Sequence, residues 1–203
     1  MKFIIRLFLF ITMMLFCCLA NAQPTVGVIL DAPLVLTEND KNLQKLDAKL
    51  KEIFPSDKCN LLPSKELTEQ SITYRSAHNM MLVAGPDMRM PLTRGILCEL
   101  GKQANCDYVL LIDLKPVGKK ESGGMISRYS DGKSMVVAAL SDIQVVNVLA
   151  NKYEYKKQVI SLGVDSVTKV FGIGRNPKED KAIEKLFTKG FLEKLTIKPS
   201  AIP

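Results

Sequence analysis

Histidine and cysteine are scarce in this sequence, and their scarcity excludes several kinds of active site. The 203 residues include one histidine, His78, and five cysteines. A catalytic triad needs a histidine beside a nucleophile, and no motif marks a serine or cysteine as the partner of His78. The cysteines form no C-x-x-C pair and His78 is remote from them, which disfavours a zinc site. We therefore expect no metal ion, no cofactor and no catalysis.

Long runs of one charge are also missing. The chain carries 28 lysines and arginines against 21 acidic residues, a formal net charge of +7. The lysines are dispersed, with only Lys119–Lys120 and Lys156–Lys157 adjacent, and no basic run alternates with aromatic residues as in proteins that bind single-stranded nucleic acid. We expect no nucleic-acid partner. The modest positive charge suits solubility or weak contact with anionic envelope polymers.

The first 22 residues have the three parts of a cleavable secretory signal peptide. Lys2 and Arg6 give a positive start, residues 7–19 form an apolar run, and Ala20-Asn21-Ala22 is a small-x-small cleavage site before Gln23. Cleavage after Ala22 would remove two basic residues and leave a net charge of about +5. The processed chain is then exported, to a periplasm or to the extracellular space.

A transmembrane anchor and a lipoprotein signal are the alternatives for this segment. A membrane-spanning helix needs roughly 20 apolar residues, and the run is shorter than that. A lipoprotein signal has a small residue before the lipidated cysteine, whereas Phe16 precedes Cys17 and Cys17 precedes Cys18. We therefore expect no transmembrane anchor after processing.

Export would place the three other cysteines, Cys59, Cys98 and Cys106, in an oxidising compartment. Three thiols allow three pairings, each with one thiol left over. The pair Cys98 and Cys106 closes the shortest loop and is a possible disulfide, with Cys59 as an alternative partner. Spacing alone does not choose among the pairings, because a disulfide depends on where the Cα atoms lie.

Apolar patterning predicts one α/β domain over residues 23–203. The first half alternates short apolar runs with amphipathic stretches, which predicts buried strands followed by helices. Asn39 or Asp40 is positioned to cap the first helix and Ser64 to cap the second. The expected elements are a strand at Val26–Leu30, a helix carrying Leu43, Leu46, Leu50 and Ile53, a strand at Cys59–Leu62, a helix from Lys65, and a helix entered through Asp87–Pro91.

The second half predicts the centre of the sheet, a hairpin and a final helix. Asp107–Leu114 is almost continuously apolar, as in a central strand. Met135–Val148 and Tyr153–Leu162 predict an antiparallel hairpin. Residues 118–133 are rich in glycine, serine and lysine, which predicts a flexible loop or hairpin. The whole is an α/β (α+β) fold: a mixed sheet of about five strands with helices packed on it, closed by a carboxy-terminal amphipathic helix.

The start of the final helix is the one place where the sequence suggests a small ligand. Asn176 and Pro177 have the residue types of a cap and a first helical position. Backbone N–H groups at a helix N-terminus can hold an anion, and Gly174 and Arg175 lie just before it. We note a possible anion contact at Gly174 and Arg175, with a plain turn and cap as the alternative.

Four stretches of the sequence, taken in order, resemble a known kind of domain. They are Val26–Asp31, Leu61–Leu67, Asn105–Leu114 and Ser141–Tyr155. Their order resembles the small α/β domain shared by the amino-terminal region of TolB, the curli-secretion lipoprotein CsgG and the penicillin-binding-protein activator LpoB. The resemblance implies an envelope domain that binds other proteins or assembles, without catalysis. The long segment after Pro116 and the lack of a lipidated cysteine depart from that pattern.

We therefore predict an exported, non-catalytic binding or assembly module of the cell envelope, with an envelope protein or polymer as its partner. The alternative is an exported hydrolase with an unrecognised active site. A hydrolase brings a nucleophile, a base and an orienting group into one pocket. A module presents an exposed apolar patch or an open sheet edge instead.

Overall fold

A five-stranded mixed sheet forms the centre of the computed structural model, which describes residues 23–80, 90–127, 130–170 and 173–202. The strand order is β2-β1-β3-β4-β5. β1 pairs in parallel with β2 and β3, whereas the β3–β4 and β4–β5 pairs are antiparallel. The strands are β1 (Thr25–Asp31), β2 (Asn60–Leu61), β3 (Tyr108–Ser127), β4 (Ser130–Asn147) and β5 (Lys152–Val170). The predicted fold class is confirmed.

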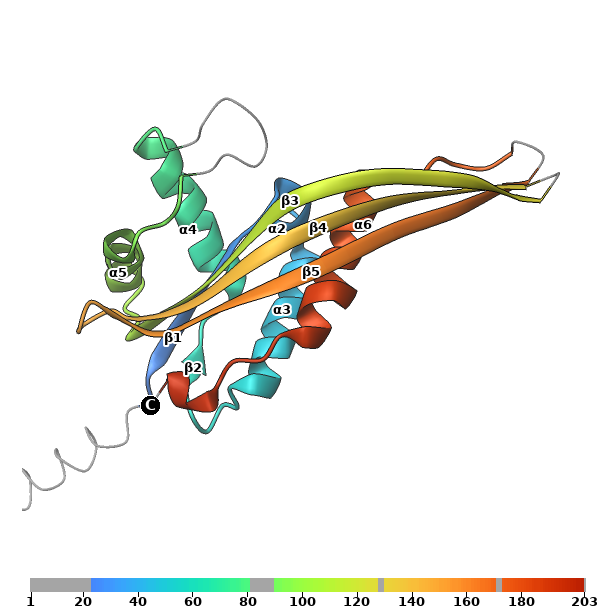
Figure 1. Ribbon diagram of the computed structural model, residues 1–203. Coiled ribbons are helices and arrows are strands. Elements are labelled where there is room, and N and C mark those ends of the chain that lie inside the picture. Colours follow the sequence, from blue (N-terminus) through green and yellow to red (C-terminus); the bar gives the residue numbers. More distant parts are fainter. Residues whose placement is uncertain (1–22, 81–89, 128–129, 171–172, 203) are drawn as a thin grey trace, which may run out of the picture.

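Helices cover the two faces of this sheet unequally. One face, called the inner face, carries α2 (Leu34–Thr37), α3 (Asp40–Ile53), α6 (Glu179–Lys185) and its π-helical continuation η1 (Leu186–Phe191). The outer face carries α4 (Ser64–Ala77) and α5 (Arg94–Gln103), and only at one end. Two 3₁₀ turns, η2 (Leu192–Lys194) and η3 (Pro199–Ala201), complete the chain. Figure 1 shows α3 and α6 beneath the sheet, and α4 and α5 above one end of it.

Two apolar cores follow from this arrangement. Alternate residues of a strand face opposite sides, so β1 and β3 contribute to both cores. The inner core joins Leu30, Leu110 and Val145 to the buried faces of α3, α6 and η1. The outer core joins Ile29 and Val109 to α4 and α5. The sheet is thus sandwiched between helices at one end, the near half, and covered only on its inner face at the other, the far half.

Several predicted elements are confirmed. β1 includes the predicted Val26–Leu30, and β3 contains Asp107–Leu114 except for its first residue and lies at the middle of the sheet. β4 and β5 form the predicted antiparallel hairpin. The predicted cap of α3 is also present, because the Asn39 side chain accepts a hydrogen bond from the Lys41 backbone N–H over 3.1 Å.

Three predicted helix starts are wrong by a few residues. α4 begins at Ser64 itself, α5 at Arg94 rather than near Pro91, and α6 at Glu179 rather than Pro177. In two cases a distant carboxylate takes the capping role. Asp47 accepts from the Ser64 N–H, and Asp165 accepts from the Lys178 N–H, each over 3.0 Å. At α5, the Arg75 guanidinium bonds the Met90 carbonyl at 2.9 Å; residues 81–89 lie outside the described chain.

For residues 118–133 the sequence predicted a flexible loop or a hairpin, and the described residues form the hairpin, as the far half of the β3–β4 pair. The glycines that suggested turns pair across the strands: Gly124 faces Gly132, and Gly123 faces Lys133. A register shift between Pro116 and Gly118 accommodates the proline, which has no N–H to donate to the ladder. The strand forms because β4 and β5 supply backbone partners along its length.

The expected signal peptide, residues 1–22, lies outside the described chain. Over the ranges that are described, no helix combines the length and the apolar character that crossing a bilayer requires.

Candidate interaction surface

The outer face of the far half presents an apolar surface without a helix above it. Beyond α4 and α5, cross-strand neighbours on β4 and β5 pair apolar residue with apolar residue. We call these six residues the bare face: the pairs are Leu140 with Ile160, Ala138 with Leu162, and Val136 with Val164. Figure 1 shows this side of β3, β4 and β5 without a helix above it.

Three side chains of the bare face are strongly exposed. Ile160 is 71% exposed, Leu162 56% and Val164 42%. Burying a fully exposed side chain of this size contributes about 1.5–3 kcal/mol, so covering these partly exposed three contributes roughly 3–5 kcal/mol. Association itself costs about 4–15 kcal/mol, so these three side chains contribute to binding but need further contacts to hold a partner. Contiguous apolar patches of this kind mark interaction sites.

Polar pairs close both ends of the bare face. Gln158 donates to the Asp142 carboxylate over 2.7 Å at one end. The Ser134 and Ser166 hydroxyls lie 3.0 Å apart at the other. On the β3 side, Lys115 faces Leu140 and pairs with the Asp113 carboxylate at 2.6 Å. Polar pairs therefore bound the apolar surface at both ends. On the β3 side Lys115 bounds it in part, while Val117 is 62% exposed there, and the fourth side is the edge of the sheet.

That fourth side is β5, which is an edge strand. Among the described residues its backbone pairs with β4 on one side, and the other side shows only the isolated bridge between Val170 and Ile173. An edge strand presents a row of N–H and C=O groups that another strand can pair with. The bare face thus continues into an open sheet edge.

A buried carboxylate anchors β5 from the inner side. Asp165 is fully buried and accepts hydrogen bonds from both Arg175 guanidinium nitrogens, at 2.5 and 2.8 Å. Lys185 adds a third contact at 3.0 Å. The Arg175 guanidinium holds the pKa of the Asp165 carboxyl well below its usual range, against the opposing effect of burial, and the Lys178 N–H and Lys185 act in the same direction.

The hydrogen bonds of Asp165 involve the groups that the sequence suggested for an anion contact at Gly174 and Arg175. The Arg175 charge is already matched by Asp165, and the N–H before α6 is bonded to the same carboxylate. Gly174 adopts a φ of +147°, a region that favours glycine. The structure therefore places an internal carboxylate, rather than an open anion position, beside Arg175.

The helical segment under β5 lies unusually close to the strand. A Cβ on Gly163 would lie 2.0 Å from the Ala182 carbonyl oxygen, and one on Gly190 would lie 2.5 Å from the Leu162 carbonyl oxygen. Both glycines therefore allow backbone to approach backbone. This contact supports the inner side of β5 directly opposite the most exposed part of the bare face.

A second buried ion pair closes the carboxyl end of β1. Asp31 and Arg75 are both almost completely buried, and the guanidinium contacts both carboxylate oxygens. Arg75 also bonds the Met90 carbonyl. The two residues lie 44 positions apart in the sequence, so no local pattern predicts the pair. The pair ties α4 to β1 and to the chain that enters α5.

Cys59, Cys98 and Cys106 are free thiols in the described structure, and the possible disulfide between Cys98 and Cys106 stays a prediction. Cys98 donates to the Asn151 side chain at 3.4 Å in the β4–β5 turn, whereas Cys106 lies against β1 near Gly27. Cys59 belongs to the inner core, on the opposite side of the sheet from both. Burial raises the pKa of the Cys106 thiol to about 11, and the charge of Asp107 adds to the effect.

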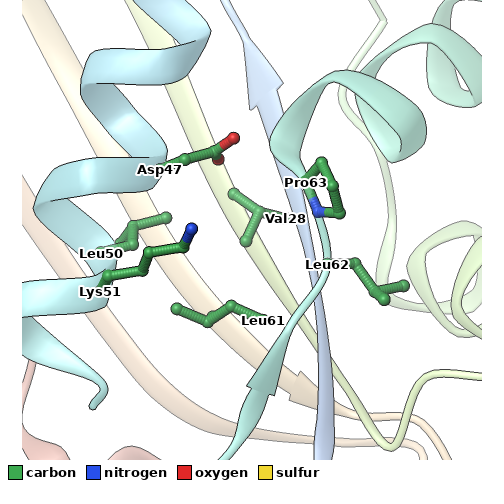
Figure 2. A pocket seen from close by; sticks show the side chains of 7 residues that line it. All are labelled: Val28, Asp47, Leu50, Lys51, Leu61, Leu62 and Pro63. Carbon is green, nitrogen blue, oxygen red and sulfur yellow. The ribbon is translucent and has the colours of Figure 1, made fainter. Parts of the chain in front are cut away.

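A small hollow lies between α3 and the chain leading into α4. Figure 2 shows its walls, with Asp47 and Lys51 on α3 facing Leu61 and Pro63. Its volume is about 50 Å³, whereas pockets for small molecules measure about 300–1,000 Å³. Asp47 is also engaged with the Ser64 N–H. The hollow has room for water rather than for a metabolite.

His78 lies in an open groove between α4 and α5. Its ring stacks on Tyr74 with 4.0 Å between centroids, and its Nδ1 lies 2.8 Å from the Tyr74 carbonyl oxygen. The groove is otherwise lined by Glu66, Glu69, Gln70, Thr73, Ala77 and Gln103. The described lining holds neither a serine nor a cysteine, and the described chain has no cluster of metal-ligating side chains. The hydrolase alternative gains no support at His78.

The sequence predicted that a binding module would have an apolar patch but did not locate it. The predicted hairpin strand Tyr153–Leu162 is part of β5. Its residues Ile160 and Leu162 face solvent, and the buried positions beside them include Ser161 and Gly163. The signal was present in the sequence: apolar residues on one face of the strand alternate with small ones on the other.

Comparisons with known proteins found likeness only at the level of structure. Neither a family model nor a curated protein matches the chain. Similar solved structures include the hypothetical protein CT253 of Chlamydia trachomatis, at 13% identity and a TM-score of 0.32, covering 83% of this chain and 93% of that one. The LpoB C-terminal domain of Escherichia coli has 13% identity, 69% and 83% coverage, and a TM-score of 0.33.

Lipoprotein GNA1162 of Neisseria meningitidis is similar at 12% identity and a TM-score of 0.33, with 76% of this chain and 87% of that chain covered. Scores of this size carry no argument about function, so the functional reading rests on the residues of this chain.

Proposed function

We propose that this chain is an exported, non-catalytic binding or assembly module of the cell envelope, and that it binds protein through the bare face and the edge of β5. The observation that carries the proposal is the bare face itself. It is apolar, contiguous and bordered by polar pairs, and it ends at an open sheet edge. The signal-peptide pattern of residues 1–22 supports export.

Site-specific crosslinking in the producing cell tests the proposal. A photo-reactive amino acid at Val164, on the bare face, is compared with one at Leu149, which is 94% exposed in the β4–β5 turn and distant from the bare face in sequence. We expect one reproducible protein adduct from position 164 and none from position 149. Mass spectrometry of the adduct identifies the partner, including a second copy of this chain.

Two results would count against the proposal. The first is an equal pattern of adducts from both positions, since a binding surface is local. The second is recovery of the chain without any protein adduct from position 164. Edman or mass analysis of the recovered protein tests the export step separately, because cleavage after Ala22 leaves Gln23 as the first residue.

A further inference from the structure

We infer that the partner of the β5 edge is a second copy of this chain, bound by antiparallel pairing of β5 with β5 around Leu162. This inference rests on the proposed function, because it names the occupant of the same surface. The pairing would join the two sheets into one continuous sheet and the two bare faces into one continuous apolar surface.

The middle of β5 lacks the features that normally keep an edge strand apart from other strands. Protective edges carry charged side chains, prolines or bulges, or are covered by a helix or loop. Here η1 contacts the Leu162 backbone through Gly190, from the inner side of the sheet. From Gln158 to Val164 the strand has no charge and no proline, and its register with β4 is regular. The register shift of the β4–β5 pair lies outside this stretch, between Val145 and Val146. The edge is therefore suited to accept another strand.

In one antiparallel register, the exposed apolar side chains of β5 lie opposite apolar side chains of β5 from a second copy. In antiparallel pairing around Leu162, that residue faces its own copy and Ile160 faces Val164 of the other chain. All three exposed apolar residues then meet apolar partners. Pairing around Ser161 sets Val164 against Gln158, and pairing around Gly163 sets Ile160 against Ser166. The register around Leu162 is the better match because directly opposed side chains interact most strongly.

The charges of β5 also agree with this register. Like charges that face each other across a strand pair are destabilising. Around Leu162, Lys156 faces Thr168 and Lys157 faces Val167, while Lys169 faces Tyr155. No two lysines are opposed. Asp165 faces Val159, and both are on the inner side, where Arg175 and Lys185 already match the carboxylate.

The first test is the solution mass of the protein purified from cells that express the full chain, measured over a range of concentrations by light scattering and sedimentation. We expect a reversible dimer. Leu162→Lys sets two positive charges against each other and should weaken the dimer at least tenfold. Leu149→Lys makes the same change at an exposed position outside β5 and should leave the dimer unchanged.

A second variant keeps the test decisive if Leu162→Lys fails to fold. In Leu162→Cys the two introduced thiols face each other, and directly opposed Cβ atoms are about 4.5–5.5 Å apart. Oxidation or a short bifunctional thiol reagent should give a covalent dimer, whereas Leu149→Cys should not. The three native thiols are buried. The same treatment of the parent protein measures any crosslinking that comes from them.

The outcomes separate this inference from the proposed function. A dimer that is lost in Leu162→Lys and crosslinked in Leu162→Cys supports both. A monomer at all concentrations, with a different protein crosslinked from position 164 in the cell, overturns the inference and keeps the proposed function. A dimer that Leu162→Lys leaves intact also overturns the inference, because its contact lies elsewhere. Absence of any adduct from position 164 counts against the proposed function, whatever the mass.

Discussion

Two aspartates each accept a hydrogen bond from the backbone at the start of a helix that is distant in sequence. Asp47 on α3 binds the first N–H of α4, and Asp165 on β5 binds the N–H before α6. Each replaces a cap that a local serine or asparagine would otherwise supply. Asp165 is also fully buried and forms ion pairs with both Arg175 and Lys185. The position of α6 under β5 therefore depends strongly on one side chain.

Asp165→Asn should destabilise the fold at neutral pH by about 1.5–3 kcal/mol, the range for hydrogen bonds to charged groups. Arg175 and Lys185 are partly exposed, which keeps the loss below that of a fully buried pair. Because the pKa of Asp165 is lowered in the folded state, the stabilisation that its charge provides is complete above the ordinary aspartate pKa of 3.8. It is lost as the pH falls through the folded pKa. Denaturant unfolding at several pH values measures the difference.

The stability gap between the parent protein and Asp165→Asn should therefore narrow as the pH is lowered below 3.8. Asp131→Asn is the matched control, because Asp131 lies on the neighbouring strand and is exposed. A constant gap at all pH values would show that the substitution acts by packing and not through the charge.

Residue-scale predictions from the sequence succeed when the partner is close along the chain. Asn39 caps α3 as predicted because its partner is two positions away. The caps predicted at Ser64 and Asn176 fail because the acceptors come from 17 and 13 positions away. The Asp31–Arg75 pair spans 44 positions and was not predicted for the same reason. Local patterns carry no information about which side chains the fold brings together.

At the scale of elements, the contact between β5 and the helical segment below it has no room for side chains. Gly163→Ala would set a methyl group 2.0 Å from the Ala182 carbonyl oxygen and 2.5 Å from the Leu186 backbone nitrogen. Backbone cannot move aside as a flexible side chain does. We expect a loss of about 1–3 kcal/mol, typical of overpacking, measured as a lower midpoint of thermal or denaturant unfolding.

Gly118→Ala is the control for this prediction. Gly118 also lies in the sheet, but a Cβ there would have no atom within 4 Å other than those of Gly118 and its two chain neighbours. Its unfolding midpoint should stay close to that of the parent protein. Equal losses at both positions would mean that the cost comes from the glycine backbone in general and not from the contact with α6 and η1.

Element types were predicted better than element lengths. The central strand and the β4–β5 hairpin were expected because their apolar runs are strong. The far half of β3 lies in a segment that the sequence predicted as a flexible loop or a hairpin, because its glycines and lysines favour turns. It is a strand because β4 supplies a complete ladder of partners from Lys119 to Ser127 with one register shift. Pairing with a neighbour overrides composition here, and the sequence does not show the neighbour.

Over the whole molecule, the number of layers changes along the sheet. The near half lies between two helical layers, with buried residues such as Leu110 on the inner face and Leu111 on the outer face. The far half has helices on the inner face alone. The bare face exists because β3, β4 and β5 extend beyond α4 and α5. Its location depends on strand length, which is why the sequence predicted a patch without placing it.

Amide hydrogen-exchange rates should differ between the near half of the sheet, which has helices on both faces, and the far half, which has them on one. Amides that are buried under helices on both faces open only in large unfolding events, whereas a strand covered on one face opens locally at lower cost. We expect amides around Val109–Ile112 to exchange at least about tenfold more slowly than those around Lys119–Ser122. Peptide-resolved exchange followed by mass spectrometry measures both. Uniform protection along β3 would contradict the layered description.

The β5 amides add a concentration dependence to the same experiment. If two copies pair along β5, residues around Leu162 gain hydrogen-bond partners only in the dimer, so their exchange should slow as the protein concentration rises. The β3 amides, which lie two strands away from the edge, should not respond. Leu162→Lys should abolish the effect of protein concentration on exchange in β5, because that effect comes from pairing at the sheet edge. It should leave the difference in exchange rate along β3 unchanged, because that difference comes from the helical layers.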